Sequence, residues 1–266
     1  MVLATLLGCL VSTLLGGQGT AHAAHSGDER SDPQAAMTEA ERALIERYAP
    51  IVMLKQQKDP CDTDGEPYEP APVEIVLGDA GVALRENAGG KASADPTLLH
   101  APTADDLAVA ADATYLDFPG NPRNAGCTYA RFSQERMRSL EPTTYARIAL
   151  APEEGKLALQ YWFFYVFNDF NNTHESDWEM IQLVFDAESV EEALTKDPEV
   201  VGYAQHGGGE LAEWDDRKLQ RDGSRPIVYP AAGSHGSYFG SEVYIGWGAG
   251  GTGFGCDDTS GPSRRV

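Results

Sequence analysis

Short apolar segments alternate with turn-forming clusters along the second half of the chain. The segments are rich in Tyr, Trp, Phe, Val and Ile, and Gly, Asn, Asp and Pro join them, which is typical of β-strands. We predict strands at 144–150, 157–169, 177–186, 199–206, 225–232 and 241–247, and two shorter ones at 50–55 and 71–77. Strands so closely spaced predict a mainly β fold, an antiparallel β-sandwich or jelly-roll-like domain with a few peripheral helices.

The helical signals are fewer. Residues 38–50 predict a helix because Thr38 and Glu41 have capping-box spacing, apolar positions recur on one face, and Pro50 ends the pattern. A second capping box, Ser189 with Glu192, begins a predicted helix over 189–197. Residues 103–111 and 133–140 predict two further short helices within a region of loops.

The first 23 residues carry no charge, have a leucine-rich centre, and end in the small-x-small pattern Ala21-His22-Ala23. They predict a secretory signal peptide, followed by a flexible linker at 24–37 and a single domain at 38–266. The predicted location is therefore extracellular, with no transmembrane segment after removal of the signal.

Charge and cysteine content narrow the function. The chain has 41 acidic against 20 basic residues, a net charge of -21, which repels phosphate backbones and argues against nucleic acid as a partner. Three cysteines remain after signal removal. Export favours a disulfide, and we predict Cys61 with Cys127 because both lie in polar, turn-rich surroundings, which leaves Cys256 unpaired.

An acidic cluster interrupts the most apolar part of the chain. Side chains alternate faces along a strand, so Asp169 shares the apolar face of 157–169, while Asp177 and Glu179 share that of 177–186. The short connection brings these acidic ends together, with His174 on the loop. At about 5 Å and an effective dielectric near 20, each like-charge pair costs roughly 3 kcal/mol. Three pairs would cost on the order of 10 kcal/mol, which rivals the stability of a domain.

Some compensation is therefore required: a bound divalent cation, proton uptake by one carboxylate, or side chains that splay into water. Oxygen-rich ligation with one imidazole favours Mg²⁺ or Ca²⁺ over Zn²⁺. We predict a cation site formed by Asp169, His174, Asp177 and Glu179. The further candidates for ligand or supporting positions are His206, His235 and Trp178. Both histidines lie at predicted strand ends among small residues, where a purely structural hydrogen bond is the alternative.

The stretches "RYAPIVML", "LQYWFFYVFNDF", "HESDWEMIQLVF", "YAQHGGGE", "RPIVYPAAGSHGSYF" and "GCDDTSGP" together resemble the vacuolar protein sorting-associated protein 62-like family, in a secreted bacterial-type form. Relatives in that family run on past the last stretch, so the resemblance implies a C-terminal truncation and a lost partner for Cys256. It also implies protein sorting or membrane association.

The core "H-x-x-D-W-E" is more distantly similar to the central motif of the necrosis- and ethylene-inducing peptide-like proteins. Those are secreted sandwich folds that hold a divalent cation and engage membrane sphingolipids. The matching positions are His174, Asp177, Trp178 and Glu179, and Asp169 stands for the acidic ligand on the preceding strand.

These observations favour a secreted, non-enzymatic, divalent-cation-binding β-sandwich that engages a cell-surface or membrane ligand, such as a glycan or lipid headgroup. One alternative is a metal-assisted hydrolase of phosphoester or glycan, with His174 or His235 transferring a proton. A second is a structural cell-surface protein whose acidic cluster stiffens on binding calcium.

Overall fold

The computed structural model describes residues 37–59, 61, 65–89, 95–248 and 253–266. The predicted signal peptide and all but the last residue of the predicted linker lie outside these ranges. No helix within them is long and apolar enough to cross a bilayer. The described residues form a mainly β protein with several antiparallel sheets and a few short helices, which confirms the predicted fold class.

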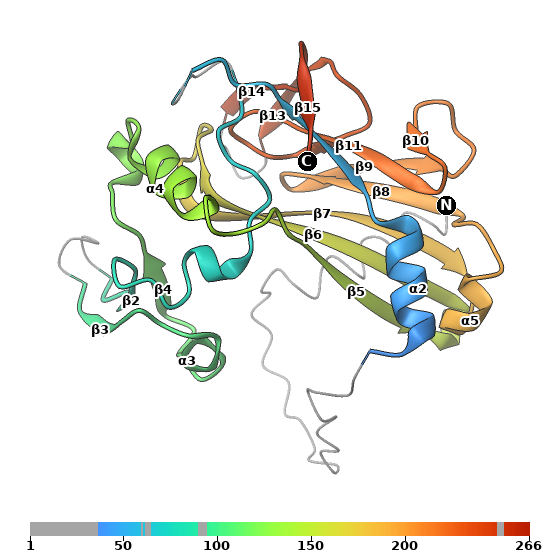
Figure 1. Ribbon diagram of the computed structural model, residues 1–266, viewed down its shortest axis with the longest axis horizontal. Coiled ribbons are helices and arrows are strands. Elements are labelled where there is room, and N and C mark those ends of the chain that lie inside the picture. The colour runs from blue at the N-terminus through green and yellow to red at the C-terminus, as the bar shows by residue number, and fades with distance from the viewer. Residues whose placement is uncertain (1–36, 60, 62–64, 90–94, 249–252) are drawn as a thin grey trace. The chain divides into compact units, whose positions relative to one another are not determined.

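The largest sheet has five strands in the order β5-β6-β7-β8-β9, so each strand is paired with its neighbour in sequence (Figure 1). The strands are β5 (Thr144–Ala151), β6 (Lys156–Asn168), β7 (His174–Asp186), β8 (Val200–Gln205) and β9 (Gly208–Glu213). The first four confirm the prediction, although β7 begins three residues earlier than expected. The prediction missed β9, because its glycines read as a turn.

A second sheet has the order β10-β11-β1-β15, with β12 (Ser237–Tyr238) paired to β11. Its strands are β1 (Ile51–Lys55), β10 (Arg221–Asp222), β11 (Arg225–Pro230) and β15 (Ser263–Arg265). Strands β1 and β11 run parallel, an exception to the antiparallel arrangement that we predicted. The two sheets meet where the Tyr203 hydroxyl on β8 donates to the Ile227 carbonyl on β11, at 2.9 Å.

The smaller strands form two separate sheets. A three-stranded sheet has the order β3-β2-β4, with β2 (Ala83–Glu86), β3 (Thr97–His100) and β4 (Thr114–Asp117). Strands β13 (Val243–Gly248) and β14 (Gly253–Asp258) form a two-stranded sheet. The prediction included β13 but not its partner.

The helices follow their capping signals. Helix α2 (Glu39–Tyr48) has the predicted capping box between Thr38 and Glu41. Helices α3 (Ala104–Ala108), α4 (Thr128–Met137) and α5 (Val190–Ala193) also form, and α4 begins five residues before the predicted start. At α5, the Ser189 hydroxyl accepts from the Glu192 amide, as in the predicted capping box. The Glu192 carboxylate accepts from the Glu188 amide and not from that of Ser189, so the second hydrogen bond of the box is not formed.

The strand predicted at 71–77 is wrong. That segment contains a 3₁₀ turn, η1 (Val73–Ile75), preceded by Pro72. Two further 3₁₀ turns are η3 (Pro122–Asn124) and η4 (Pro152–Glu154). Ile75 and Val76 are both buried although they are neighbours, which a strand with one buried face does not permit. The apolar side chains of this segment are therefore buried by a 3₁₀ turn and not by a pleated strand.

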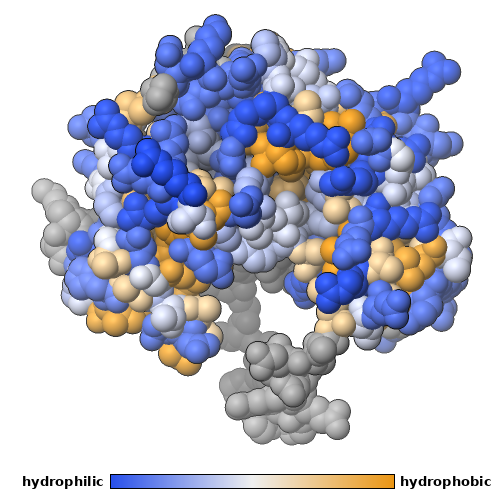
Figure 2. All heavy atoms as spheres, viewed as in Figure 1, coloured by the Kyte–Doolittle hydropathy of each residue, from blue (hydrophilic) through white to orange (hydrophobic). Residues whose placement is uncertain are grey.

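The main core lies on the odd-numbered face of β6 and β7. Its members in these strands are almost fully buried: Leu157, Leu159, Tyr161, Phe163, Tyr165, Phe167, Ile181, Leu183 and Phe185. Each large side chain of this kind stabilises the fold by about 1.5–3 kcal/mol on burial. Helix α2 packs on the same face, where the Tyr161 hydroxyl donates to the Ile45 carbonyl at 2.6 Å. The side of the molecule that Figure 2 shows is largely hydrophilic, with separated apolar patches.

The cysteines pair as predicted. Cys61 and Cys127 form a disulfide across 66 residues of sequence, with 5.4 Å between their Cα atoms. Cys256 on β14 is free and exposed. The disulfide joins the loop after β1 to the N-terminus of α4, and the loop also carries Glu66, which belongs to the region described below.

Candidate functional site

The acidic ends of β6 and β7 lie where strand parity placed them. Asp177 pairs with Tyr165, and Glu179 pairs with Phe163, so both carboxylates share the core-facing side of β7. Asp169 lies just beyond the end of β6, where its backbone amide donates to the Gly233 carbonyl at 2.8 Å. The two acidic strand ends therefore meet at one end of the core, beside the loop that follows β11.

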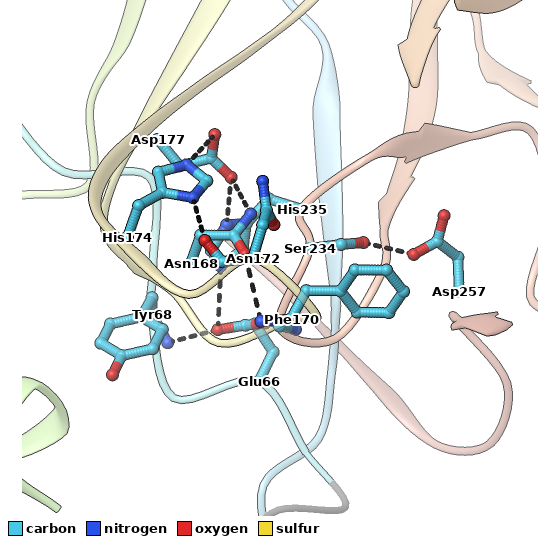
Figure 3. Close-up of polar contacts among 11 residues, drawn as sticks. Glu66, Tyr68, Asn168, Phe170, Asn172, His174, Asp177, Ser234, His235 and Asp257 are labelled. Carbon is cyan, nitrogen blue, oxygen red and sulfur yellow. Dashed lines mark hydrogen bonds and ion pairs between the residues drawn. The ribbon is translucent and has the colours of Figure 1, made fainter. Parts of the chain in front are cut away.

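His235, from that loop, lies at the centre of the site and is completely buried (Figure 3). Its Nδ1 lies 2.9 Å from Asp177 Oδ2, and its Nε2 lies 3.4 Å from Glu66 Oε1. Burial alone would lower the pKa of His235, but the charge of Glu66 and the hydrogen bond to Asp177 outweigh burial and raise it to about 10. A buried imidazolium thus supplies one of the positive charges that the acidic cluster requires.

Asp177 uses its two oxygens differently. Its Oδ2 accepts from Asn168 Nδ2 at 2.9 Å and from His235 Nδ1, whereas its Oδ1 faces His174 Nε2 at 3.6 Å. Burial raises the pKa of this carboxyl, but hydrogen bonds from His174, His235 and Asn168 outweigh burial and hold it well below its usual range. Asp177 is therefore a carboxylate at every physiological pH.

His174 stands at the outer edge of the site, with 41% of its side chain exposed. Its Nδ1 lies 3.2 Å from the Asn172 carbonyl, and only an N–H can donate to a carbonyl oxygen. Nδ1 therefore carries a proton, and Nε2 can donate to Asp177 Oδ1 only in the protonated ring. Loss of the Nε2 proton leaves a lone pair beside this oxygen. The hydrogen bond with Asp177 raises the pKa of His174, and burial opposes that shift.

Asp169 and Glu179 lack such donors. Within the described part of the chain, neither carboxylate accepts a hydrogen bond. Burial raises the pKa of Asp169, with a contribution from the charge of Glu66, and burial raises that of Glu179 far more, with a contribution from Asp177. This shift favours the protonated form of Glu179, one of the three ways in which the predicted repulsion can be relieved.

The four predicted ligands do not form a ready-made coordination shell. Across residues 37–266 as described, no three His, Cys, Asp or Glu side chains are arranged to hold a metal ion. His174 and Asp177 are the close pair, while Asp169 and Glu179 interact with the same buried His235 at longer range. The sequence prediction therefore brings the correct strand ends together but does not give their side-chain geometry.

The three supporting candidates have different positions. His235 is the centre of the site, as described above. His206 occupies the turn between β8 and β9 and forms an ion pair with Asp257 Oδ2 at 2.6 Å, as well as stacking on Phe170. Trp178 lies on the opposite face of the sheet, 44% exposed and packed against Tyr145 and Phe164, because its parity is opposite to that of Asp177. It therefore takes no part in this site.

The backbone is unusual at three places around the site. Ser176, His206 and His235 have φ angles of 59°, 50° and 58°, in the left-handed region that non-glycine residues seldom adopt. Ser176 lies within β7, directly before Asp177. Such conformations cost on the order of 1–3 kcal/mol each and tend to cluster at functional sites.

Three residues were missed by the sequence analysis. Glu66 is fully buried and accepts from the amides of Tyr68 and Gly233, each at 2.8 Å. Asn168 donates to Asp177, and Asp257 accepts from Ser234 and Tyr238, each at 2.5 Å. A buried carboxylate in a loop leaves no periodic signal in the sequence, so only its contacts identify it.

No family model and no curated protein matches this chain, so the resemblance to the vacuolar protein sorting-associated protein 62-like family finds no support there. The solved structures that are similar include "NLPPya in complex with glucosamine" (16% identity, 79% of this chain and 71% of that chain, TM-score 0.42). Two more are "Toxin fold for microbial attack and plant defense" (16%, 74% and 64%, 0.39) and "NLPPya in complex with mannosamine" (16%, 77% and 74%, 0.38).

Another similar structure is necrosis and ethylene inducing protein 2 from the causal agent of cocoa's witches broom disease (16%, 54% and 54%, TM-score 0.30). These neighbours are of the kind to which the "H-x-x-D-W-E" core is similar. With identities near 16% and TM-scores below 0.5, they assign no family and no ligand to this chain.

Proposed function

We propose that this protein is a secreted divalent-cation-binding β-sandwich protein, and that the cation lies at the β6–β7 turn beside His174 and Asp177. The bound cation then engages an extracellular surface ligand, such as a glycan or lipid headgroup. The finer family assignment, to the vacuolar protein sorting-associated protein 62-like proteins, rests on the motif likeness alone.

The observation that carries the proposal is the closeness of two potential ligand atoms, His174 Nε2 and Asp177 Oδ1, at the partly exposed edge of the site. Binding of the ion would displace the proton that these two atoms share in the protonated pair. Nδ1 of His174 is committed to a backbone carbonyl, the arrangement that orients metal-binding histidines, and Nε2 is directed at Asp177 Oδ1. Two ligands of one Mg²⁺ or Ca²⁺ ion at right angles lie about 3–3.5 Å apart. The 3.6 Å separation of Nε2 and Oδ1 is close to that spacing.

The remaining residues fit a hard, oxygen-preferring cation. Asp169 and Glu179 accept no hydrogen bond from the described residues, so their oxygens are available as ligands once an ion has displaced any proton from them. The Tyr165 hydroxyl is a further buried oxygen without a partner there. Because no coordination shell is preassembled, Asp169 and Glu179 must rotate or act through water, which suits Mg²⁺ since it commonly retains several waters.

A bound cation also suits ligand binding by an acidic protein. With a net charge of -21, the protein repels anionic groups, and a divalent ion at the surface end of the site supplies local positive charge that can hold ligand oxygens. The partly exposed His174 gives such a ligand access, whereas His235 has no exposed surface through which it could exchange a proton with a substrate. The burial counts against His235 as the proton-transfer residue of a hydrolase and leaves His174 as the candidate for that role.

Isothermal titration with MgCl₂ and with CaCl₂, after removal of metal by EDTA, tests the cation. We expect saturable binding and a higher melting temperature with the ion. Asp177→Asn should abolish binding, while Asp215→Asn, an exposed acid in a turn away from the site, should retain it. Absence of binding to both ions by wild-type protein would refute the proposal. Ion-dependent turnover of phosphoester or glycoside substrates would instead favour a hydrolase.

A further inference from the structure

We infer that Asn168 and His235 are positioning residues that make Asp177 a one-oxygen ligand, directed at the same point as His174. This inference rests on the proposed function, because it concerns the presentation of that cation ligand. It assigns a role to two residues that would not themselves touch the ion.

The evidence is the unequal occupation of the Asp177 carboxylate. Asn168 Nδ2 and His235 Nδ1 both reach Oδ2, each at 2.9 Å, and they come from different parts of the fold (Figure 3). Asn168 ends β6, and His235 belongs to the loop after β11. With Oδ2 occupied from two directions, Oδ1 is the oxygen left to face His174 Nε2.

Asn168 is itself held in place. It is 95% buried, its Oδ1 accepts from the Phe170 amide at 3.1 Å, and it pairs with His174 in the β6–β7 register. The Asn168 side chain therefore connects the turn with the Asp177 carboxylate, and its backbone pairs with that of His174. Its amide cannot flip without losing both hydrogen bonds, so the donor has a defined direction.

The His235 ring is held by two aromatic contacts and one hydrogen bond, while its Nε2 forms an ion pair without a hydrogen bond. One face lies flat on the Tyr165 ring, with 4.0 Å between centroids, and its edge meets Tyr68 at 6.0 Å. Nε2 is directed at Glu66, which two backbone amides hold in turn. Rotation of the ring away from Asp177 would separate it from Tyr165 and from Glu66, whose carboxylate accepts from the amide of Gly233 in the same loop.

The consequence is a carboxylate with little rotational freedom. A free aspartate can turn either oxygen, or both, toward an ion, and ordering it reduces the favourable free energy of binding. Residues that orient metal ligands in this way typically contribute 10–100-fold to metal affinity. Loss of either donor should therefore weaken cation binding by about tenfold or more.

Three variants of the full chain test the role, with the titrations in MgCl₂ alone and in CaCl₂ alone at constant pH. His235→Ala removes the donor, whereas His235→Asn keeps an amide donor near the place of Nδ1 and tolerates the positive φ at this position. Both variants lose the ring contacts and the approach to Glu66. Asn168→Ala removes the second donor, and Asn87→Ala, which removes a comparable turn hydrogen bond at an exposed site, is its control.

We expect His235→Ala and Asn168→Ala to bind about tenfold or more weakly, and His235→Asn and Asn87→Ala to bind within about threefold of wild type. Near-UV circular dichroism checks that each variant is folded. If His235→Ala does not fold, the affinity of Asn168→Ala alone tests the inference. Equal affinity in wild type and folded Asn168→Ala would overturn the inference while leaving the cation site standing. Equal weakening by His235→Asn and His235→Ala would assign His235 a purely structural role. Wild-type protein that binds neither ion would remove both the proposed function and this inference.

Discussion

The ring of His235 lies flat on the ring of Tyr165, with 4.0 Å between their centroids and 5° between their planes. Both side chains are completely buried, and the Tyr165 hydroxyl has no hydrogen-bond partner among the described residues. The stacking places a cationic imidazole on an aromatic face, a favourable contact in a dry interior. The Tyr165 hydroxyl, buried without a hydrogen-bond partner among the described residues, lowers the stability of the fold through its desolvation.

Removal of that hydroxyl should therefore stabilise the protein. An unsatisfied buried hydroxyl costs about 1–3 kcal/mol, so we expect Tyr165→Phe to raise the free energy of unfolding by about 1 kcal/mol in EDTA. Tyr161→Phe is the matched control: its hydroxyl donates to the Ile45 carbonyl, so its loss should lower stability by a similar amount. Urea denaturation measures both. A clear destabilisation by Tyr165→Phe would contradict the prediction.

Gly233 should tolerate no side chain. Its φ is +82°, and a Cβ there would lie 2.6 Å from the Asp169 carbonyl oxygen, far closer than van der Waals contact. We expect Gly233→Ala to lower the free energy of unfolding by more than about 2 kcal/mol, because strain at positive φ and a backbone clash add.

Gly223 separates these two effects. Its φ is +63°, yet nothing lies within 4 Å of its Cβ position. Gly223→Ala should therefore cost only about 1 kcal/mol, from the backbone conformation alone. Thermal or urea unfolding of the two variants gives the comparison, and equal losses would show that the contact with Asp169 is not limiting.

The disulfide should carry much of the stability. Closing a loop of 66 residues stabilises a fold by about 4 kcal/mol in the chain-entropy model, and measured values of about 2–4 kcal/mol are typical. We expect the double variant Cys61→Ser, Cys127→Ser to lose stability in that range. Cys256→Ser, at the free and exposed cysteine, should change it by less than about 0.5 kcal/mol.

The same double variant should loosen α4 selectively. Cys127 precedes α4, and Tyr129 in its first turn donates to Glu175 at 2.5 Å and stacks on Phe167. Hydrogen exchange should therefore accelerate in α4 before it does in β8, a strand that is paired on both sides, with β7 and β9. Uniform acceleration throughout the chain would contradict this local role.

The ion pair between His206 and Asp257 should make stability depend on pH. The hydrogen bond to Asp257 raises the pKa of His206 above 6.5, so its contribution is complete below pH 6.5 and is lost as the pH rises through the folded-state value. Although burial raises the pKa of Asp257, hydrogen bonds from His206, Ser234 and Tyr238 outweigh it and lower it below 3.8, so that contribution is lost only in strong acid.

His206→Asn should therefore destabilise the protein more at pH 5 than at pH 9. Asparagine tolerates the positive φ of this turn position, so the comparison reports mainly the lost ion pair. Denaturant titrations of both proteins at the two pH values measure the difference. A difference that is larger at pH 9 would contradict the assignment.

Local patterns in the sequence predicted much of the fold. Thr38 and Glu41 gave the start of α2, and alternating apolar residues gave β6 and β7, including the face shared by Asp177 and Glu179. These succeed because caps and pleat parity depend on residues a few positions apart. The same logic failed at 71–77, where β-branched residues pack through a 3₁₀ turn.

The sequence by itself determined that two acidic strand ends and a histidine meet at one turn, because the pleat and a short connection allow nothing else. Only the tertiary structure decided what compensates their charge: His235, 58 residues from Asp177 in the chain, brings a positive charge into the cluster. Glu66, 111 residues from Asp177, adds a further buried carboxylate that pairs with the same ring. Such contacts form when the sheets pack together and exclude water. The periodicity of the sequence does not indicate which distant polar groups are brought together in this way.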